Sequence, residues 1–141
     1  MSKGNTHIND YLKLIFNATT DATLFSAAGS ATNLYVSLHT ASPGAGGSQT
    51  TNEAAYTSYA RATVARTTGG WTAASAQSTS PVANIDFVAA TGGSETETHF
   101  AVGTASTGVG KIICFGTITP NIPVSTGTTP RLTTASTITE T

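Results

Sequence analysis

Short segments in which apolar and polar residues alternate recur along most of this chain, and this pattern of period two favours β-strands. Residues 34–40 are the clearest case, because Leu34, Val36 and Leu38 fall on one side of a strand and the residues between them on the other. Further strands are expected at residues 59–66, 83–88, 99–104, 111–117, 122–125, 130–133 and 137–139. Glycine- and proline-containing turns separate these segments. The pattern predicts an all-β protein, and we expect an antiparallel jelly-roll β-sandwich.

The first thirty residues follow a helical period instead. Apolar residues at spacings of three, four and seven predict a short amphipathic helix over residues 8–16, with Asn5 or Thr6 as its N-cap. Residues 27–30 have the composition of a linker. We therefore expect an N-terminal helical arm and linker over residues 1–30, followed by a β-sandwich domain over residues 31–141. The pattern leaves open whether the helix packs on its own domain or docks on another protein.

The composition excludes several classes of partner. Charged residues make up 9% of the chain and the net charge is -1, so no basic surface is available for nucleic acid or anionic lipid. No apolar run is long enough to span a membrane, and the N-terminus lacks the apolar stretch of a secretory signal, so we expect synthesis in a cytoplasm. Threonine occupies 29 of the 141 positions. Such a hydroxyl-rich, weakly charged surface is typical of a protein that stays packed against other proteins.

Groups for catalysis or cofactor binding are scarce. The three histidines, His7, His39 and His99, lack the spacing of metal ligands, and no serine lies in a nucleophile elbow. Glu95 and Glu97 share one side of an extended segment, so they could serve a glycosidase or hold a calcium ion. An exposed loop carrying two repelling carboxylates is the interpretation we favour. We expect no enzyme activity, no metal and no cofactor.

Two other features allow alternative interpretations. Trp71, with Tyr56 and Tyr59, could form a platform that stacks on sugars, although we expect Trp71 to lie in the core after the turn at residues 69–70. Cys114 is the single cysteine and lies in an apolar run, so we expect a buried, unreactive thiol.

Many short motifs of this chain, spread over nearly its whole length, resemble those of small virion proteins of tailed bacteriophages. They are Lys3-Gly4-Asn5-Thr6, Asn9-Asp10, residues 12–16, residues 33–40, Pro43-Gly44, Thr50-Thr51-Asn52-Glu53, Tyr56, Tyr59-Ala60-Arg61, Val64-Ala65-Arg66, Gly70-Trp71, Ala90-Thr91-Gly92-Gly93, residues 98–104 and Gly108-Val109-Gly110-Lys111. Within that group the chain is most similar to the capsid cement (decoration) proteins of short-tailed phages.

The resemblance implies a non-enzymatic jelly-roll protein on the outer surface of the capsid, made in the host bacterial cytoplasm. Its expected partners are the major capsid protein, whose shell it would stabilise, and a second copy of itself in a homodimer or small oligomer; no nucleic acid and no membrane are expected. The candidate interface residues are Ile8, Tyr11, Leu12, Ile15, Phe16 and Tyr35. The alternative function is a tail-associated or receptor- or glycan-binding β-sandwich module.

Overall fold

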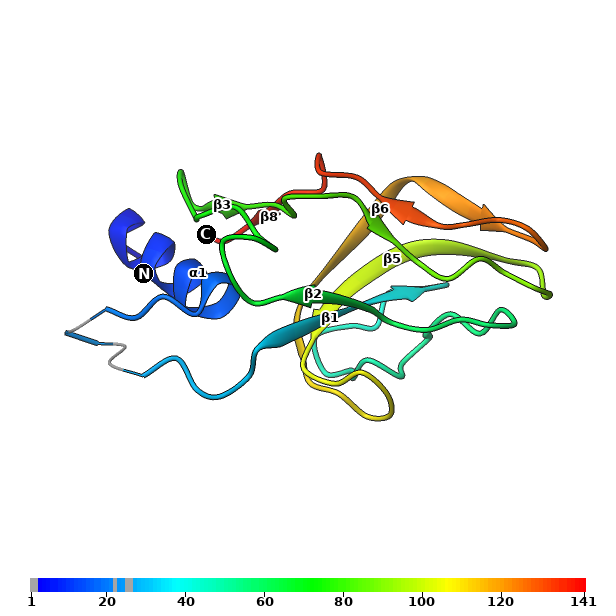
Figure 1. The fold of residues 1–141 in the computed structure, drawn as a ribbon, viewed down its shortest axis with the longest axis horizontal. Coiled ribbons are helices and arrows are strands. Elements are labelled where there is room, and N and C mark those ends of the chain that lie inside the picture. Colours follow the sequence, from blue (N-terminus) through cyan, green and yellow to red (C-terminus); the bar gives the residue numbers. More distant parts are fainter. Residues whose placement is uncertain (1–2, 22, 25–26) are drawn as a thin grey trace. The chain divides into compact units, whose positions relative to one another are not determined.

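The computed structural model describes residues 3–21, 23–24 and 27–141, and these residues form one helix and eight strands (Figure 1). The elements are α1 (Asn5–Asn17), β1 (Asn33–His39), β2 (Ala62–Ala65), β3 (Ser78–Thr79), β4 (Ile85–Asp86), β5 (Glu95–Gly103), β6 (Ile112–Val124), β7 (Arg131–Leu132) and β8 (Ile138–Thr139). The prediction of a mainly β fold with a short N-terminal helix is therefore confirmed.

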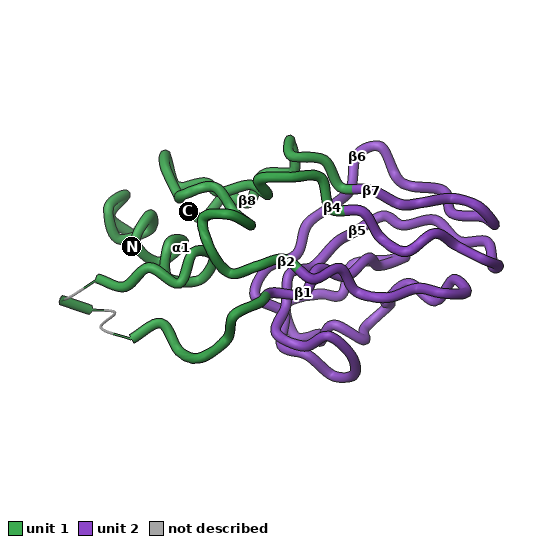
Figure 2. The backbone as a smooth tube through the Cα atoms, in the orientation of Figure 1, with its two compact units in different colours: residues 1–33, 64–85, 132–141 green, residues 34–63, 86–131 purple. Residues whose placement is uncertain are grey.

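The chain divides into two compact units, each built from separated segments (Figure 2). Unit 1 comprises residues 1–33, 64–85 and 132–141, and unit 2 comprises residues 34–63 and 86–131. The domain boundary expected near residue 30 lies close to residue 33, where the first segment of unit 1 ends. Unit 1 also contains segments from the middle and the end of the chain. The assignment of residues 1–30 and 31–141 as separate domains stays a prediction.

The largest sheet has four strands in the order β2-β1-β5-β6. Strand β1 pairs antiparallel with β5, and β5 pairs antiparallel with β6. Both faces of β1 are covered, because Leu34, Val36 and Leu38 are buried on one face and Ser37 and His39 on the other. The alternation in the sequence correctly gave the strand, but it did not reveal that the polar face is also buried.

Strand β6 corrects the expected turn at residues 119–121. The two strands predicted at residues 111–117 and 122–125 are one continuous strand in which Glu97 pairs with Ile122 and His99 with Thr117. Residues 118–121 therefore lie opposite the single residue Thr98. A bulge of this kind lets the chain continue in the sheet where the proline would otherwise favour a turn.

The remaining strands are short. Strands β3 and β8 form an antiparallel pair and β4 lies beside β7, each strand having two residues. Strand β3 was not expected from the sequence, and β5 begins four residues earlier than predicted. The antiparallel β-structure is confirmed, whereas the jelly-roll topology stays a prediction.

Helix α1 belongs to the core of unit 1. Ile8, Leu12 and Phe16 are buried at intervals of four residues, and the Phe16 ring lies edge-on to Trp71 with 4.9 Å between ring centroids. The Asn17 side chain donates a hydrogen bond to the carbonyl of Trp71. The helix therefore packs on its own unit. The sequence had left open whether these residues pack there or dock on another protein.

The start of α1 differs from the prediction. Gly4 occupies the N-cap position and no side chain caps the helix there, so the expected capping by Asn5 or Thr6 is wrong. At the other end, Ala18 takes a left-handed conformation, and the N–H groups of Ala18 and Thr19 both donate to the carbonyl of Lys13.

Arg66 holds the end of α1 in place. Its guanidinium is buried and donates hydrogen bonds to the carbonyls of Leu14 at 2.5 Å and Ile15 at 2.7 Å, in the last turn of the helix. It also donates to the carbonyls of Ala28 and Ala31 in the segment that leads to β1. A cation at a helix C-terminus is favourable because it lies at the negative end of the helix dipole. One side chain therefore fixes the helix and the connection to the next strand.

Candidate functional site

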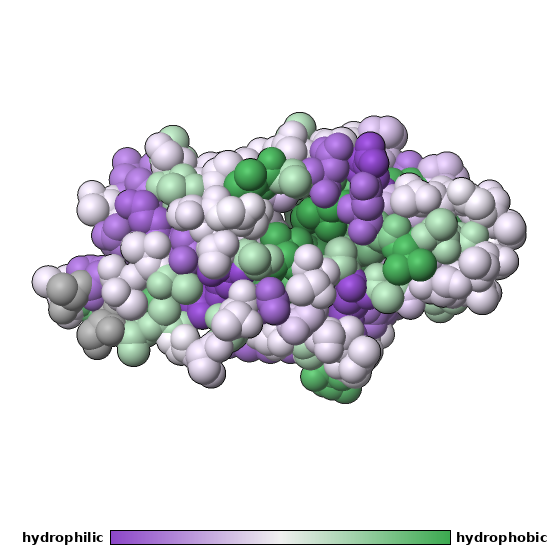
Figure 3. Space-filling view, viewed as in Figure 1, coloured by the Kyte–Doolittle hydropathy of each residue, from purple (hydrophilic) through white to green (hydrophobic). Residues whose placement is uncertain are grey.

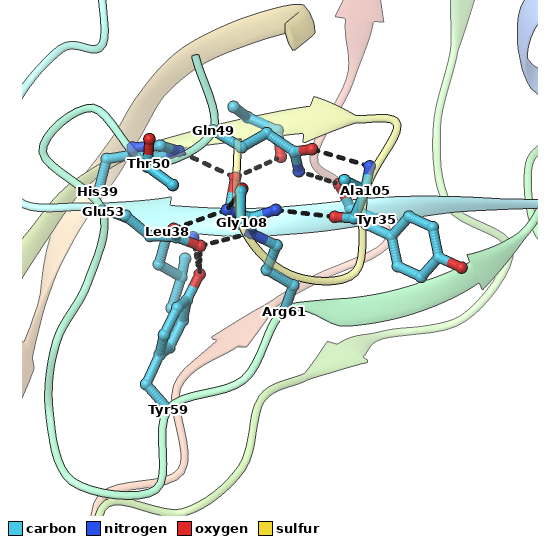
Figure 4. A network of polar contacts seen from close by, with 12 residues as sticks. Tyr35, Leu38, His39, Gln49, Thr50, Glu53, Tyr59, Arg61, Ala105 and Gly108 are labelled. Carbon is cyan, nitrogen blue, oxygen red and sulfur yellow. Dashed lines mark hydrogen bonds and ion pairs between the residues drawn. The ribbon is translucent and has the colours of Figure 1, made fainter. Parts of the chain in front are cut away.

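A network of polar contacts in unit 2 supports the loop that joins β5 to β6 (Figure 4). Arg61 and Glu53 form a bidentate ion pair with distances of 2.6 and 2.8 Å, and both side chains are largely buried. The same guanidinium donates to the carbonyls of Ala105 and Gly108 in the loop. Tyr59 donates its hydroxyl to Glu53 and accepts the N–H of Leu38 of β1. The β5–β6 loop is therefore tied to the rest of the unit by an arginine fork.

Gln49 supports the same loop from a second position. The side chain is fully buried, donates to the carbonyl of Tyr35 at 3.2 Å and accepts the N–H of Ala105 at 3.0 Å. Gly103 and Gly110 leave room for it, because a Cβ atom on either glycine would come within 2.5 Å of the Gln49 amide. The loop that this network holds presents Val109, whose side chain is 83% exposed.

Gly110→Ala is therefore expected to destabilise the protein by about 2 kcal/mol, because the new methyl group would displace Gln49 from its two hydrogen bonds. Gly46→Ala is the matched control, since a Cβ atom at Gly46 meets no atom within 4 Å. Chemical denaturation of both variants measures the difference. Equal stabilities would contradict the role given to the close packing of Gln49.

Ser37 and His39 form a pair that resembles part of a catalytic triad. The Ser37 hydroxyl lies 2.9 Å from Nε2 of His39, and Nδ1 of His39 lies 2.9 Å from the carbonyl oxygen of Thr51. Burial lowers the pKa of His39, which favours the neutral ring that donates from Nδ1 and accepts at Nε2. Both side chains are fully buried, and the third partner is a carbonyl where a triad has a carboxylate. In this buried position the two hydrogen bonds of His39 link Ser37 of β1 to the backbone at Thr51.

Glu95 and Glu97 lie in β5, and the expected exposed loop is wrong. Glu95 is partly buried and accepts hydrogen bonds at 2.8 Å from the backbone N–H groups of Ala55 and Tyr56. Glu97 is 0% exposed, and neither of its oxygens accepts a hydrogen bond from a described N–H or O–H group. Burial, with smaller contributions from a hydrogen bond to Glu95 and from the charge of Glu95, raises the pKa of Glu97 to about 8. The proton of Glu97 relieves the repulsion that two carboxylates would otherwise have.

The aromatic residues do not form a surface for sugars. Trp71 is 1% exposed and lies in unit 1, while Tyr56 is buried and Tyr59 is partly buried in unit 2. The core position of Trp71 is confirmed and the stacking platform is excluded. Cys114 is half-buried, so the expected burial of its thiol is wrong, and the expected lack of reactivity stays a prediction.

The six candidate interface residues fall into different environments. Ile8, Leu12 and Phe16 are buried inside unit 1, Ile15 is half-buried, and Tyr35 is half-buried in β1. Tyr11 is 37% exposed. The structure therefore does not bring the six residues together on one surface. Their role in contacts with another protein stays a prediction.

Tyr11 borders a hollow within unit 1. This hollow of about 270 Å³ is lined by Lys3, His7, Ile8, Tyr11 and Glu140, and an ion pair between Lys3 and Glu140 links the two ends of the chain beside it. Among the described residues no group of three or more histidine, cysteine or acidic side chains is placed to hold a metal ion. The helix found in the described part of the chain is too short to cross a membrane.

A comparison with known protein families matches residues 7–140 of the chain to the family described as podophage GP4 fiber I protein gp80. Among curated proteins, none matches the sequence. Since the family covers nearly the whole chain, including the Arg66 anchor, the Glu53–Arg61 network and the acidic pair in β5, the protein belongs to the podophage gp80 fibre-protein family and is a structural protein of a short-tailed phage virion.

Proposed function

We propose that this protein is a non-enzymatic component of the tail fibre region, where it connects other virion proteins by permanent packing contacts. The observation that carries the proposal is the match of residues 7–140 to a family described as a fibre protein. The resemblance to virion proteins seen in the sequence points to the same particle. The two differ in position, because the resemblance implies a place on the capsid and the family description implies a place in a fibre.

The chemistry of the described residues supports a structural role. The two groupings that resemble catalytic residues, Ser37 with His39 and Glu95 with Glu97, each include fully buried side chains. Figure 3 shows that weakly polar residues cover much of the visible face, with strongly hydrophilic residues in scattered places. Few charged groups then need to lose their hydration when such a surface meets another protein.

A capsid cement is the second candidate function. The resemblance of the sequence to decoration proteins favours it, and the same weakly charged surface would suit contacts with neighbouring subunits of the major capsid protein. In this role the protein would stabilise the mature shell on its outer surface. Adding interface area that must be lost before the shell opens would raise the temperature at which the shell fails.

Phage particles that lack the protein separate the two functions. For a fibre component, we expect particles with unchanged shell melting and adsorption to host cells reduced at least about tenfold. Added purified protein should restore adsorption with a saturable dose response, because occupancy follows its free concentration. Shells that melt early while adsorption is normal would contradict the fibre role and favour the cement. Particles unchanged in both assays would contradict both.

A further inference from the structure

Strand β6 forms one edge of the four-stranded sheet and is unusually long for an edge. It has 13 residues, and β5 is its strand neighbour in the described part of the chain. Strands in globular proteins typically have about five or six residues. One side of β6 therefore presents a row of backbone N–H and C=O groups that are available to another strand.

The first half of β6 lacks two of the features that usually protect an edge, charge and proline, and its one irregularity lies at its start, where Val102 pairs with Cys114 and Gly103 with Ile112. Residues 112–124 contain no charged side chain, and both prolines of the strand, Pro120 and Pro123, lie in its second half. Residues 112–117 are Ile-Ile-Cys-Phe-Gly-Thr, a run with high β-propensity and neither charge nor proline. Phe115 is 38% exposed and Thr117 is exposed. This half of the strand is suited to pairing with a further strand.

The opposite edge of the sheet is built differently. Strand β2 has only four residues. Short length is one of the usual means by which an edge avoids pairing. The contrast between the two edges indicates that β6, rather than the sheet as a whole, is adapted to association.

We propose that residues 112–117 of β6 pair antiparallel with the same residues of a second copy of this chain, which joins two four-stranded sheets across a two-fold axis. The absence of charge argues for a second copy as the partner. In a two-fold interface the same surface meets itself, so every charge in the strand would face a like charge close by. Strand β6 carries none, and the net charge of -1 adds little repulsion between copies.

The test compares charged variants inside and outside the strand by sedimentation velocity over a concentration series. Wild-type protein should sediment with twice the 14.2 kDa mass of one chain. Phe115→Lys should raise the dissociation constant at least about tenfold, because it places two lysines in the paired edge. Thr117→Lys should act in the same way, and it guards against a loss of packing at Phe115. Val109→Lys is the control, since Val109 is 83% exposed in the β5–β6 loop and lies outside the strand.

A mixing experiment tests self-pairing directly. Phe115→Lys and Phe115→Glu chains should each be monomeric, and their mixture should form a heterodimer visible by native mass spectrometry. Thermal melting of each variant confirms that it is folded. The proposal is overturned if wild-type protein is monomeric at every concentration, or if folded Phe115→Lys and Thr117→Lys proteins dimerise as well as wild type. Neither result bears on the place of the protein in the fibre or on the shell.

Discussion

Arg66→Ala is expected to lower the free energy of unfolding by on the order of 4 kcal/mol. Arg66 is 7% exposed, and its guanidinium donates to four carbonyls, two in the last turn of α1 and two in the segment before β1. Alanine would remove all four hydrogen bonds, and a hydrogen bond to a charged group contributes about 1.5–3 kcal/mol. Ala31 is exposed, so water can replace the donor there, whereas Leu14, Ile15 and Ala28 are half-buried. The loss should appear as a lower denaturation midpoint and as faster amide exchange in α1.

Arg66→Lys separates the role of charge from that of geometry. Lysine keeps the positive charge near the helix C-terminus but lacks the planar fork that reaches several carbonyls at once, so we expect it to recover less than half of the loss. Arg131→Ala is the matched control, because Arg131 pairs with Asp86 in an exposed ion pair. A surface pair of this kind contributes little. If Arg66→Ala and Arg131→Ala had the same stability, Arg66 would not anchor the helix.

Glu97→Gln is expected to stabilise the protein in alkaline solution and to leave it nearly unchanged near pH 5. The pKa of Glu97 is raised from 4.5 to about 8 in the folded protein, so the native state keeps a proton that the unfolded chain releases. The contribution of Glu97 to stability therefore falls as the pH rises from 4.5 to about 8, and then stays constant. Glutamine mimics the protonated acid. The variant should gain on the order of 4 kcal/mol over wild type at about pH 9.

The measurement is the difference in unfolding free energy between wild type and Glu97→Gln across this pH range. Taking the difference removes the effect of His39, which acts in the opposite direction. Burial lowers the pKa of His39 below 6.5, so its contribution is present above that pH and is lost as the pH falls through the lowered value. Parallel stability curves for the two proteins would show that Glu97 is not buried as a neutral acid.

The sequence predicted those parts of the fold that depend on local patterns. Alternation in residues 34–40 gave β1, and the apolar spacing from Ile8 gave α1, because side-chain periodicity reflects which face is buried. Prediction from the sequence was less reliable where a strand depends on pairing with a distant segment. Pro120 suggested a turn, but pairing with β5 carries the chain through it as a bulge in β6. The two-residue strand β3 has no pattern of its own and exists because it pairs with β8.

The candidate site shows the same limit. Glu95 and Glu97 were recognised as a pair, yet the sequence suggested exposure because acidic residues are seldom buried without a partner. Only the folded chain shows that Glu97 is enclosed and that Glu95 accepts two backbone N–H groups. Likewise, nothing in the local sequence indicated that Gln49 fits against Gly103 and Gly110, which lie more than fifty residues away.

By itself, the sequence determined the class of fold and the low charge of the surface, since period-two alternation acts through local propensity and a low content of charge acts on the surface as a whole. The tertiary structure decided which of these weakly polar residues do specific work. Arg66 became a helix anchor, Glu97 a buried acid and β6 an open edge because segments distant in the chain lie around them or leave them uncovered. Burial and pairing are properties of several segments together, so no single segment encodes them.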